Sequence, residues 1–277
     1  MFIHSYMEIK IFLNKSVNEN ANIHFEKAKR LKNKLPGLEI ALKDTNKLIE
    51  DLTNERDKYT QNKIQRENVE SFKSSKWYDK FRWTKTFNDF LFVIGKDAGT
   101  NEVLIKKHTE KNDLIFHTET PGSPFGILKD AKDKVSLEDL EEAGQFLSCF
   151  SKQWKSGFGT ADAFWVLPEQ VSKKTVSGEY MGKGSFMVYG KKNIIKNIPL
   201  RICLGKYKIV LDENSSYYDF FSGSERTCRK ICNENYIKMQ PGRLTYKLLT
   251  NELKKKFKIL PEDLPKLIPN DVLIIKK

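Results

Sequence analysis

Apolar residues in the first third of the chain recur at alternating intervals of three and four positions, starting near Ala28. Lys, Glu, Asp and Asn fill most of the positions between them. This spacing is typical of a coiled-coil helix, in which one narrow apolar seam faces a partner helix. Pro36 and Gly37 interrupt the seam, so a kink or a short break in the helix is expected there. The apolar residues of the seam are Leu31, Leu35, Leu38, Leu42, Ile49 and Leu52.

A seam this narrow does not stabilise a helix alone in water, because most helical stability comes from packing against another element. No other part of the 277 residues carries a matching long heptad run. The helix is therefore expected to pair with a second copy of the chain or with another polypeptide. The alternative is that it folds back on its own globular domain, although core-facing helices normally have a wider apolar face.

From residue 77 onward the pattern changes to short apolar runs separated by turns. Strands are predicted at 87–95, 114–118, 125–129, 163–167, 185–189 and 201–211, and helices at 100–108, from 136 and at 244–257. A helical turn and a final strand are predicted within 260–275. The expected fold class is α+β. It divides into a coiled-coil arm (1–76), a mixed α/β domain (77–211) and a small α/β extension packed on that domain (212–277).

Ser136 and Asp139 form a capping box, which predicts where the second of these helices begins. The sequence P-G-S-P at 121–124 predicts a turn between two strands. The expected buried stripe of the helix consists of Leu137, Leu140, Leu147, Phe150 and Trp154.

The stretch W-Y-D-K-F-R-W at 77–83 interleaves aromatic rings with cations. This composition suits a platform for single-stranded nucleic acid, and it suits a buried core equally well. On a helix, Trp77, Tyr78 and Phe81 would share one face. We therefore predict that the rings are buried and clamp the coiled coil to the globular domain, with Arg82 facing solvent.

The chain has 49 Lys and Arg against 36 Asp and Glu, a formal net charge of +13. A positive surface favours a polyanionic partner such as nucleic acid or a membrane surface, and a lysine-rich proteome is the alternative explanation. Three lysine pairs stand beside predicted element ends, where they could reach a phosphate track or simply face solvent. His117 lies in an apolar strand, as an RNA contact or as a structural histidine. The predicted RNA-binding residues are Arg82, Lys106, Lys107, His117, Lys173, Lys174, Lys191 and Lys192.

Several functional classes find little support in the sequence. No run of 18 apolar residues predicts a membrane span, and His4, Glu8 and Lys10 break up the apolar N-terminus, so a soluble cytoplasmic protein is expected. The four cysteines lack histidines at zinc-finger spacing, which predicts reduced structural thiols, no metal and no cofactor. Without a nucleophile elbow, a phosphate loop or clustered carboxylates, enzymatic activity is not expected.

The heptapeptide at 77–83 and the segments at 90–108, 112–125 and 165–193 together resemble the NFACT-R domain of ribosome quality control proteins. The family includes NEMF in animals and RqcH in bacteria, and the archaeal branch is the most similar. Residues 16–29 are similar to the start of the second coiled-coil arm of the family, so the resemblance extends from about residue 9 onward. Bacterial members have a histidine after P-G-S, where this chain has Pro124 and Phe125, so no role of that histidine is carried over.

The resemblance implies RNA binding and docking on the large ribosomal subunit with a stalled nascent chain, with tRNA as a further expected partner. The tRNA-selecting residues of the family belong to its NFACT-N domain, which this sequence does not contain. The implied partner is therefore a separate polypeptide with NFACT-N and the first coiled-coil arm, or a second copy of the chain. The alternative is a free-standing RNA- or DNA-binding adaptor that works away from the ribosome.

Overall fold

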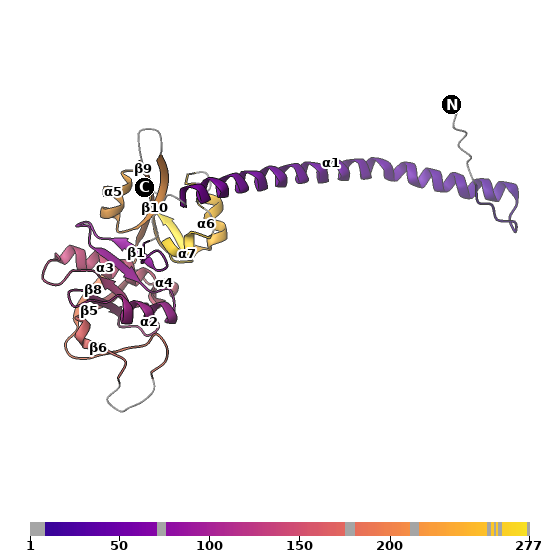
Figure 1. The fold of residues 1–277 in the computed structure, drawn as a ribbon. Helices are drawn as coiled ribbons and strands as arrows, with labels where there is room; N and C mark the ends of the chain where they lie inside the picture. The colour runs from indigo at the N-terminus through magenta and orange to yellow at the C-terminus, as the bar shows by residue number, and fades with distance from the viewer. Residues whose placement is uncertain are drawn as a thin grey trace. The chain divides into compact units, whose positions relative to one another are not determined.

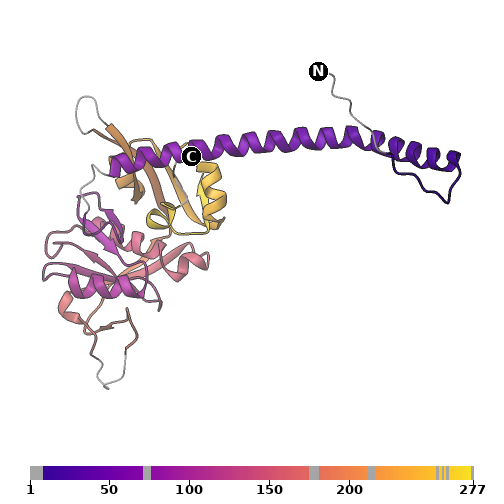
Figure 2. The ribbon, with the colours of Figure 1, turned by 45° about the vertical axis from the view of Figure 1, so that its right-hand side comes forward.

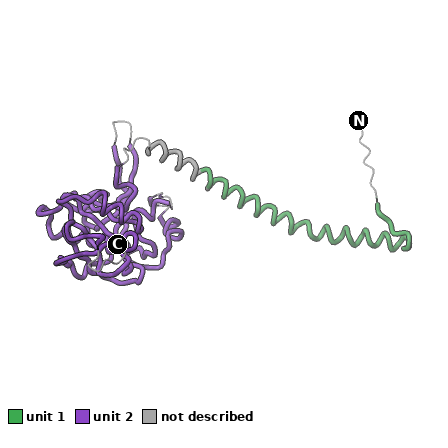
Figure 3. The backbone as a smooth tube through the Cα atoms, turned by 60° about the horizontal axis from the view of Figure 1, so that its bottom comes forward, with its two compact units in different colours: residues 1–74 green, residues 75–277 purple. Residues whose placement is uncertain are grey.

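The computed structural model describes residues 9–70, 76–174, 181–210, 216–253, 256–257, 259 and 262–275, without the side chains at 55 and 58–70. The chain divides into two compact units, residues 1–74 and 75–277, which Figure 3 shows in different colours. The first unit contains one long helix, and the second contains two antiparallel sheets with their helices. The expected α+β class is confirmed.

The first unit consists largely of helix α1 (Val17–Glu70). Ser16 caps its start, because the backbone N–H of Ser16 donates to Glu19 Oε2 over 2.7 Å and that of Glu19 donates to Ser16 Oγ over 3.3 Å. The break expected at Pro36 and Gly37 is wrong, since the helix continues through both residues (Figure 1). Proline removes one helical hydrogen bond, but the long helical runs on each side keep theirs.

The predicted seam of α1 is open to solvent. Each of its six apolar residues exposes between 55% and 66% of its surface, a large apolar area for one helix to leave in water. These residues are Leu31, Leu35, Leu38, Leu42, Ile49 and Leu52.

The second unit, whose strands are drawn as arrows in Figure 2, is built around a six-stranded antiparallel sheet. Its strand order is β1-β2-β4-β3-β5-β8. The predicted strand at 114–118 is confirmed as β3, while the strand predicted at 87–95 is shorter because residues up to 90 form a turn before β2. The strand bounds are β1 (Arg82–Lys85), β2 (Leu91–Ile94), β3 (Leu114–Thr118), β4 (Gly126–Leu128), β5 (Thr160–Val166) and β8 (Asn193–Pro199).

Both faces of this sheet are covered by apolar layers. Phe92 and Phe116 pack with Phe146 of α3 (Leu137–Cys149) on one face. Val93 and Ile115 alternate with them and pack with Leu104 of α2 (Ala98–Lys107) on the other face. Alternation of side chains along each strand therefore places the sheet between two helical layers.

The predicted capping box of α3 is confirmed, with the carboxylate of Asp139 accepting from Ser136 and from the side chain of Asn88. The predicted stripe is partly wrong. Leu147 and Trp154 are buried, Leu140 and Phe150 are partly buried, but Leu137 is 65% exposed. Leu137 is the first residue of the helix, where the apolar face has not yet reached the sheet. Trp154 lies in the short helix α4 (Lys152–Lys155).

A second sheet, with strand order β10-β9-β11-β12, joins residues from both sides of the predicted boundary at 211 and 212. That boundary itself lies outside the described residues. The predictions of β9, of a helix after residue 244 and of a final strand are confirmed, while β8, β10, β11 and α5 were not predicted. The bounds are β9 (Ile202–Val210), β10 (Ser216–Gly223), α5 (Glu225–Cys232), β11 (Tyr236–Leu244), α6 (Tyr246–Leu253), α7 (Leu264–Leu267) and β12 (Val272–Ile275).

A short 3-10 turn and a small hairpin complete the second unit. The turn η1 (Pro168–Gln170) leads into β6 (Val171–Ser172), which pairs with β7 (Met187–Val188). The strand predicted at 185–189 is therefore confirmed in shortened form.

The heptapeptide at 77–83 forms a turn that leads into β1, so the predicted helix is wrong. Its rings nevertheless pack against the protein. Phe81 is buried, Tyr78 meets Trp83 edge-on at 5.1 Å between ring centroids, and Trp77 stacks on His108 at 4.4 Å. The clamp between this stretch and the coiled coil stays a prediction, because residues 71–75, which separate the two in the sequence, lie outside the described part.

The four cysteines are free thiols in the interior, as predicted for structural cysteines. Cys203, Cys228 and Cys232 pack together with Phe221 and Tyr236. Burial raises the pKa of Cys232 to about 12 and that of Cys228 well above its ordinary value. The thiols of Cys228 and Cys232 are therefore protonated at neutral pH.

No helix within the described residues combines the length and the apolar character needed to cross a membrane.

His117 of β3 holds the turn that follows the strand. Its Nδ1 lies 2.6 Å from the carbonyl oxygen of Thr118, and its Nε2 lies 3.1 Å from that of Ser123. Burial lowers the pKa of His117 below 6.5 and outweighs the opposite effect of these two carbonyl groups. The imidazole is therefore neutral at pH 7, so one of its two nitrogens donates to a carbonyl oxygen, and the ring lies between the two ends of the turn.

Replacement of Phe146 by Ala should lower the free energy of unfolding by about 3–5 kcal/mol, because it removes a large ring that is 1% exposed. The matched change Leu137→Ala on the exposed end of the same helix should cost about 0.5 kcal/mol or less. Urea unfolding followed by tryptophan fluorescence measures both values. Equal losses in the two variants would contradict the assignment of the α3 faces.

The stability of the second unit should fall between about pH 7 and pH 5 partly through His117. The folded-state pKa lies below the unfolded value of 6.5, so the unfolded state takes up a proton that the folded state does not. Unfolding midpoints in urea at pH 8 and pH 5 measure this loss. His117→Gln should show a smaller loss than the natural chain, and a larger loss in the variant would contradict the sign of the shift.

Candidate nucleic-acid interface

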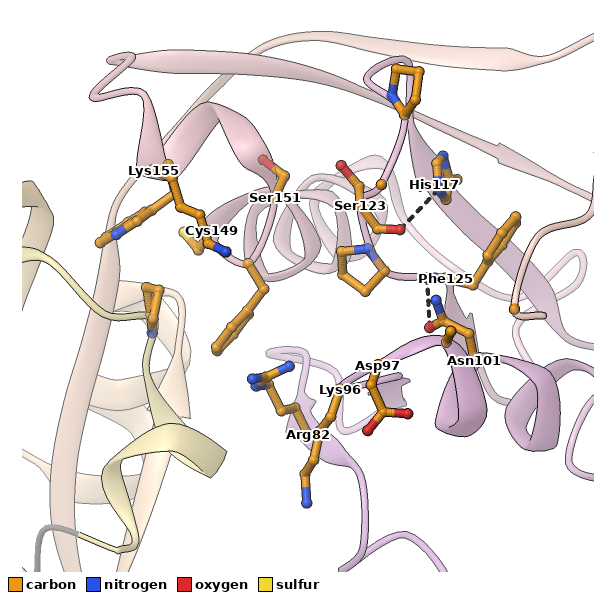
Figure 4. Close-up of a pocket in the computed structure, with 18 of the residues that line it drawn as sticks. Arg82, Lys96, Asp97, Asn101, His117, Ser123, Phe125, Cys149, Ser151 and Lys155 are labelled. Atoms are coloured by element: carbon orange, nitrogen blue, oxygen red, sulfur yellow. Dashed lines mark hydrogen bonds between the residues drawn. The ribbon is translucent and has the colours of Figure 1, made fainter. Parts of the chain in front are cut away.

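A cleft of about 620 Å³ opens in the second unit, and we call it the basic cleft. Its walls come from the start of β1 and the turn before α2, the P-G-S-P turn, the region of α4, the loop before β7, and the C-terminal segment around α6 and α7 (Figure 4). The polar and charged residues lining it are Arg82, Lys96, Asp97, Asn101, His117, Ser123, Ser151, Lys155, Lys183, Ser185, Tyr246 and Asn270.

The P-G-S-P turn forms one wall of the basic cleft and is fixed by side chains. Gly122 adopts a φ of 82°, which favours glycine. The Thr118 hydroxyl donates to Ser123 Oγ over 2.6 Å, and Asn101 Oδ1 accepts from the backbone N–H of Phe125. Together with His117, these bonds hold the turn in one position at the edge of the cleft.

Arg82 is half-buried in the basic cleft, so the expectation that it faces solvent is wrong. Its Nε donates to the carbonyl oxygen of Pro265 over 2.9 Å, and its guanidinium lies over the ring of Phe150 at 4.7 Å from the centroid. Burial lowers the pKa of Arg82, although arginine remains charged at neutral pH. Its described hydrogen-bond partners are backbone carbonyl groups, which leave its charge uncompensated.

Three lysines add to this positive charge. Lys96 stands beside Arg82, Lys155 extends from α4, and Lys183 reaches the start of α2. Among the described residues, none of the three has a carboxylate within ion-pair distance, 4.0 Å. Burial and the nearby charges of Lys266 and Arg82 lower the pKa of Lys96, which is the effect expected where cations crowd together.

Asp97 is the one carboxylate among the residues that line the cleft. Its Oδ1 accepts from the backbone N–H of Thr100 over 2.8 Å and so caps α2. This bond lowers the pKa of Asp97, so the carboxylate is ionised. Four cations and one carboxylate give the lining a net charge of +3 (4 − 1).

Lys183 is placed by its neighbour Gly184. The φ of Gly184 is +77°, and a Cβ added there would lie 2.5 Å from the backbone of Ala98. The loop can therefore approach the start of α2 only with glycine at this position. This close contact brings Lys183 to the basic cleft.

The structure brings together some of the predicted RNA-binding residues, though outside the cleft. Lys106 and Lys173 converge on Glu102, with N–O distances of 2.6 Å and 2.9 Å. Hydrogen bonds from Lys106, from the backbone of Gly184 and from Lys173 lower the pKa of Glu102 to about 2. Lys192 lies 3.3 Å from Glu119.

The remaining predicted lysines, Lys107, Lys174 and Lys191, are exposed. Of the eight predicted RNA-binding residues, Arg82 and His117 line the basic cleft. Contact of any of the eight with RNA stays a prediction. Sequence reasoning missed Lys96, Lys155 and Lys183, because each is a single lysine without a charged neighbour of the same sign. The available signal was the glycine beside Lys96 and on both sides of Lys183.

Comparison with known proteins gives the family context of this site. Residues 80–190 match the family described as "NFACT protein RNA binding domain". Over 203 residues the chain is 37% identical to the archaeal Rqc2 homolog aRqcH of Methanocaldococcus jannaschii, covering 71% of this chain and 29% of that protein. Over 120 residues it is 33% identical to the ribosome quality control complex subunit NEMF of Homo sapiens, covering 43% of this chain and 11% of that protein.

The chain thus spans less than a third of the length of these relatives. A solved structure, the C-terminal part of the fibronectin/fibrinogen-binding protein from Streptococcus suis, has a TM-score of 0.37 at 20% identity, over 46% of this chain and 48% of that one. The match over 80–190 includes most walls of the basic cleft. Residues 80–190 thus match the NFACT RNA-binding domain family, and the chain is similar over part of its length to the archaeal Rqc2 homolog aRqcH and to the ribosome quality control complex subunit NEMF.

Proposed function

We propose that this chain is an RNA-binding component of ribosome quality control, which acts in the cytoplasm and docks on a large ribosomal subunit carrying a stalled nascent chain. The observation that carries the proposal is the basic cleft, whose net charge of +3 lies within an NFACT-R domain. RNA presents a dense row of phosphates, and exposed or half-buried cations without carboxylate partners are suited to bind them. The kinship with ribosome quality control proteins supports the ribosome as the source of that RNA.

We propose further that the chain acts by binding and catalyses no reaction. The two titratable groups of the cleft that could transfer a proton near neutral pH have structural tasks. Both ring nitrogens of His117 face backbone carbonyl oxygens, and the Asp97 carboxylate caps α2. Neither has the free, directed geometry that a general base needs.

The proposal assigns α1 to pairing with a second helix. Its six seam residues are more than half exposed, and their coiled-coil spacing suits a helical partner. We place this partner helix on a separately encoded polypeptide with an NFACT-N domain, which would also handle tRNA. A second copy of the chain is the other outcome that the pairing experiment distinguishes.

Charge reversal in the basic cleft should release the chain from the large ribosomal subunit. The double variant Lys96→Glu/Lys183→Glu should weaken co-sedimentation with large subunits by about tenfold or more, because it replaces two phosphate-binding cations with anions. The salt dependence of binding should also become shallower, by about one unit of log–log slope for each lost contact. Sedimentation through a sucrose cushion at several salt concentrations measures both.

The control for this experiment is Lys111→Glu, an exposed lysine outside the cleft lining, which should keep nearly full binding. Unchanged co-sedimentation of the double variant would refute the cleft as the docking site. Crosslinking that recovers mainly messenger RNA or DNA from the natural chain would favour the free-standing adaptor.

Lys introduced into the seam should prevent helix pairing. Leu38→Lys should cost about 2 kcal/mol or more of pairing free energy, because it removes a buried leucine and places a charge in the interface. Ile40→Lys is the matched control, since Ile40 is similarly exposed on α1 but lies off the seam. Size-exclusion chromatography with light scattering, with and without the candidate partner, gives the stoichiometry. Equal effects of the two changes would argue against the seam.

A further inference from the structure

We propose that the basic cleft takes a single unpaired RNA nucleotide, with its base against the aromatic wall and its phosphate among the lysines, and that the C-terminal segment completes this site. The inference rests on the proposed RNA-binding function and names the form of RNA that the site selects. It also extends the site beyond residue 190, where the match to the NFACT-R family ends.

The size of the basic cleft suits one nucleotide. A volume of about 620 Å³ lies in the range that encloses a small organic molecule, which is the size class of one nucleotide. In a duplex the bases are stacked and paired inside the helix, so a duplex can bring only its backbone to the mouth of such a cleft. A base that is already unpaired can enter without the cost of unstacking.

The wall of the basic cleft offers a surface on which a base can stack. The ring of Phe150 is partly exposed and carries the Arg82 guanidinium on its face. Tyr246 is also partly exposed, and its hydroxyl donates to the carbonyl oxygen of Ile268 over 2.9 Å, which fixes the ring. Aromatic rings and guanidinium planes held in place in this way are surfaces on which bases stack. The stacking surface lies inside the cleft, whereas the rings of the heptapeptide at 77–83 pack against the protein.

The position of the Asp97 carboxylate decides where a phosphate can bind. The N-terminus of α2 would be an anion site, but the Asp97 carboxylate already occupies it. A phosphate must therefore bind the side-chain cations. Lys96, Lys155 and Lys183 come from three different elements and surround the cleft, and lysine binds phosphate as a flexible point charge without selecting a base. The expected recognition is selective for unpaired RNA and tolerant of sequence.

The C-terminal segment holds part of the basic cleft in place. The carbonyl oxygen of Pro265 holds Arg82, and that of Asn270 accepts from Trp154 Nε1 over 2.8 Å. Tyr246 supplies a ring to the lining. These residues lie beyond residue 190, yet they hold Arg82, anchor the buried Trp154 beneath the cleft and supply one of the rings that a base would meet. The site is therefore complete only when both parts of the second unit are folded together.

Fluorescence anisotropy with the full chain tests the proposal. The probes are a labelled six-nucleotide single-stranded RNA, as oligouridine and oligoadenosine, and a blunt RNA duplex of matched charge. We expect the single strands to bind at least about tenfold more tightly than the duplex, with little difference between the two sequences. Tyr246→Ala should weaken single-strand binding by about tenfold, while Tyr246→Phe should retain it because the ring remains. Lys155→Ala should weaken both probes, and Lys111→Ala neither.

Equal affinity for duplex and single strand, or absence of single-strand binding by the folded natural chain, would overturn the inference. If circular dichroism shows that Tyr246→Ala is unfolded, Tyr246→Phe and Lys155→Ala decide the matter. Binding of single strands by folded Tyr246→Phe supports stacking, and loss of that binding contradicts it. Lys155→Ala should still lose affinity for both probes. Failure of the proposed function looks different. In that case the oligonucleotides bind as expected, but the chain does not co-sediment with large subunits.

Discussion

The burial of Arg82 without a carboxylate partner is the constraint on which the basic cleft depends. Removing a guanidinium from water costs free energy, so its N–H groups must find acceptors and its plane must find a surface. These are supplied by the carbonyl of Pro265 and the ring of Phe150, from segments far apart in the chain. One charged side chain thereby fixes β1, the end of α3 and α7 around a common space. The cleft is the volume left between them.

The positive charge of the cleft persists because the neighbouring carboxylates have other tasks. Asp97 caps α2, Asp139 caps α3, and Glu102 is bound by Lys106 and Lys173. Asp97 contributes the one negative charge of the lining, while Asp139 and Glu102 serve a helix end and two lysines outside it. An excess of basic residues in the composition produces a positive potential in the cleft because the fold places most of the nearby carboxylates outside its lining.

The sequence predicted best the elements whose signals are local. The capping box at Ser136 and the apolar run at 114–118 gave α3 and β3 with nearly correct bounds. The heptapeptide at 77–83 failed because rings at the first, second and fifth positions fit a helix face as well as a turn followed by a strand. No short-range pattern separates the two.

The cleft was less accessible to sequence reasoning, because its cations lie between residues 82 and 183 and meet only in the folded chain. Adjacent lysines looked more informative than single ones. Yet neighbours in a helix or a strand point in different directions, so two members of a pair rarely serve one site. Lys106, for example, forms an ion pair with Glu102, whereas the adjacent Lys107 forms no ion pair with a described residue.

Pro36 makes α1 easier to bend at one point, although the helix continues through this residue. Without its N–H, the carbonyl of Lys32 loses its usual intrahelical donor, and bending at this point disrupts fewer bonds than elsewhere along the rod. A rod with one compliant joint transmits load along its axis but yields to a sideways push. The turns on either side of Pro36 can then change direction relative to each other without losing their own hydrogen bonds.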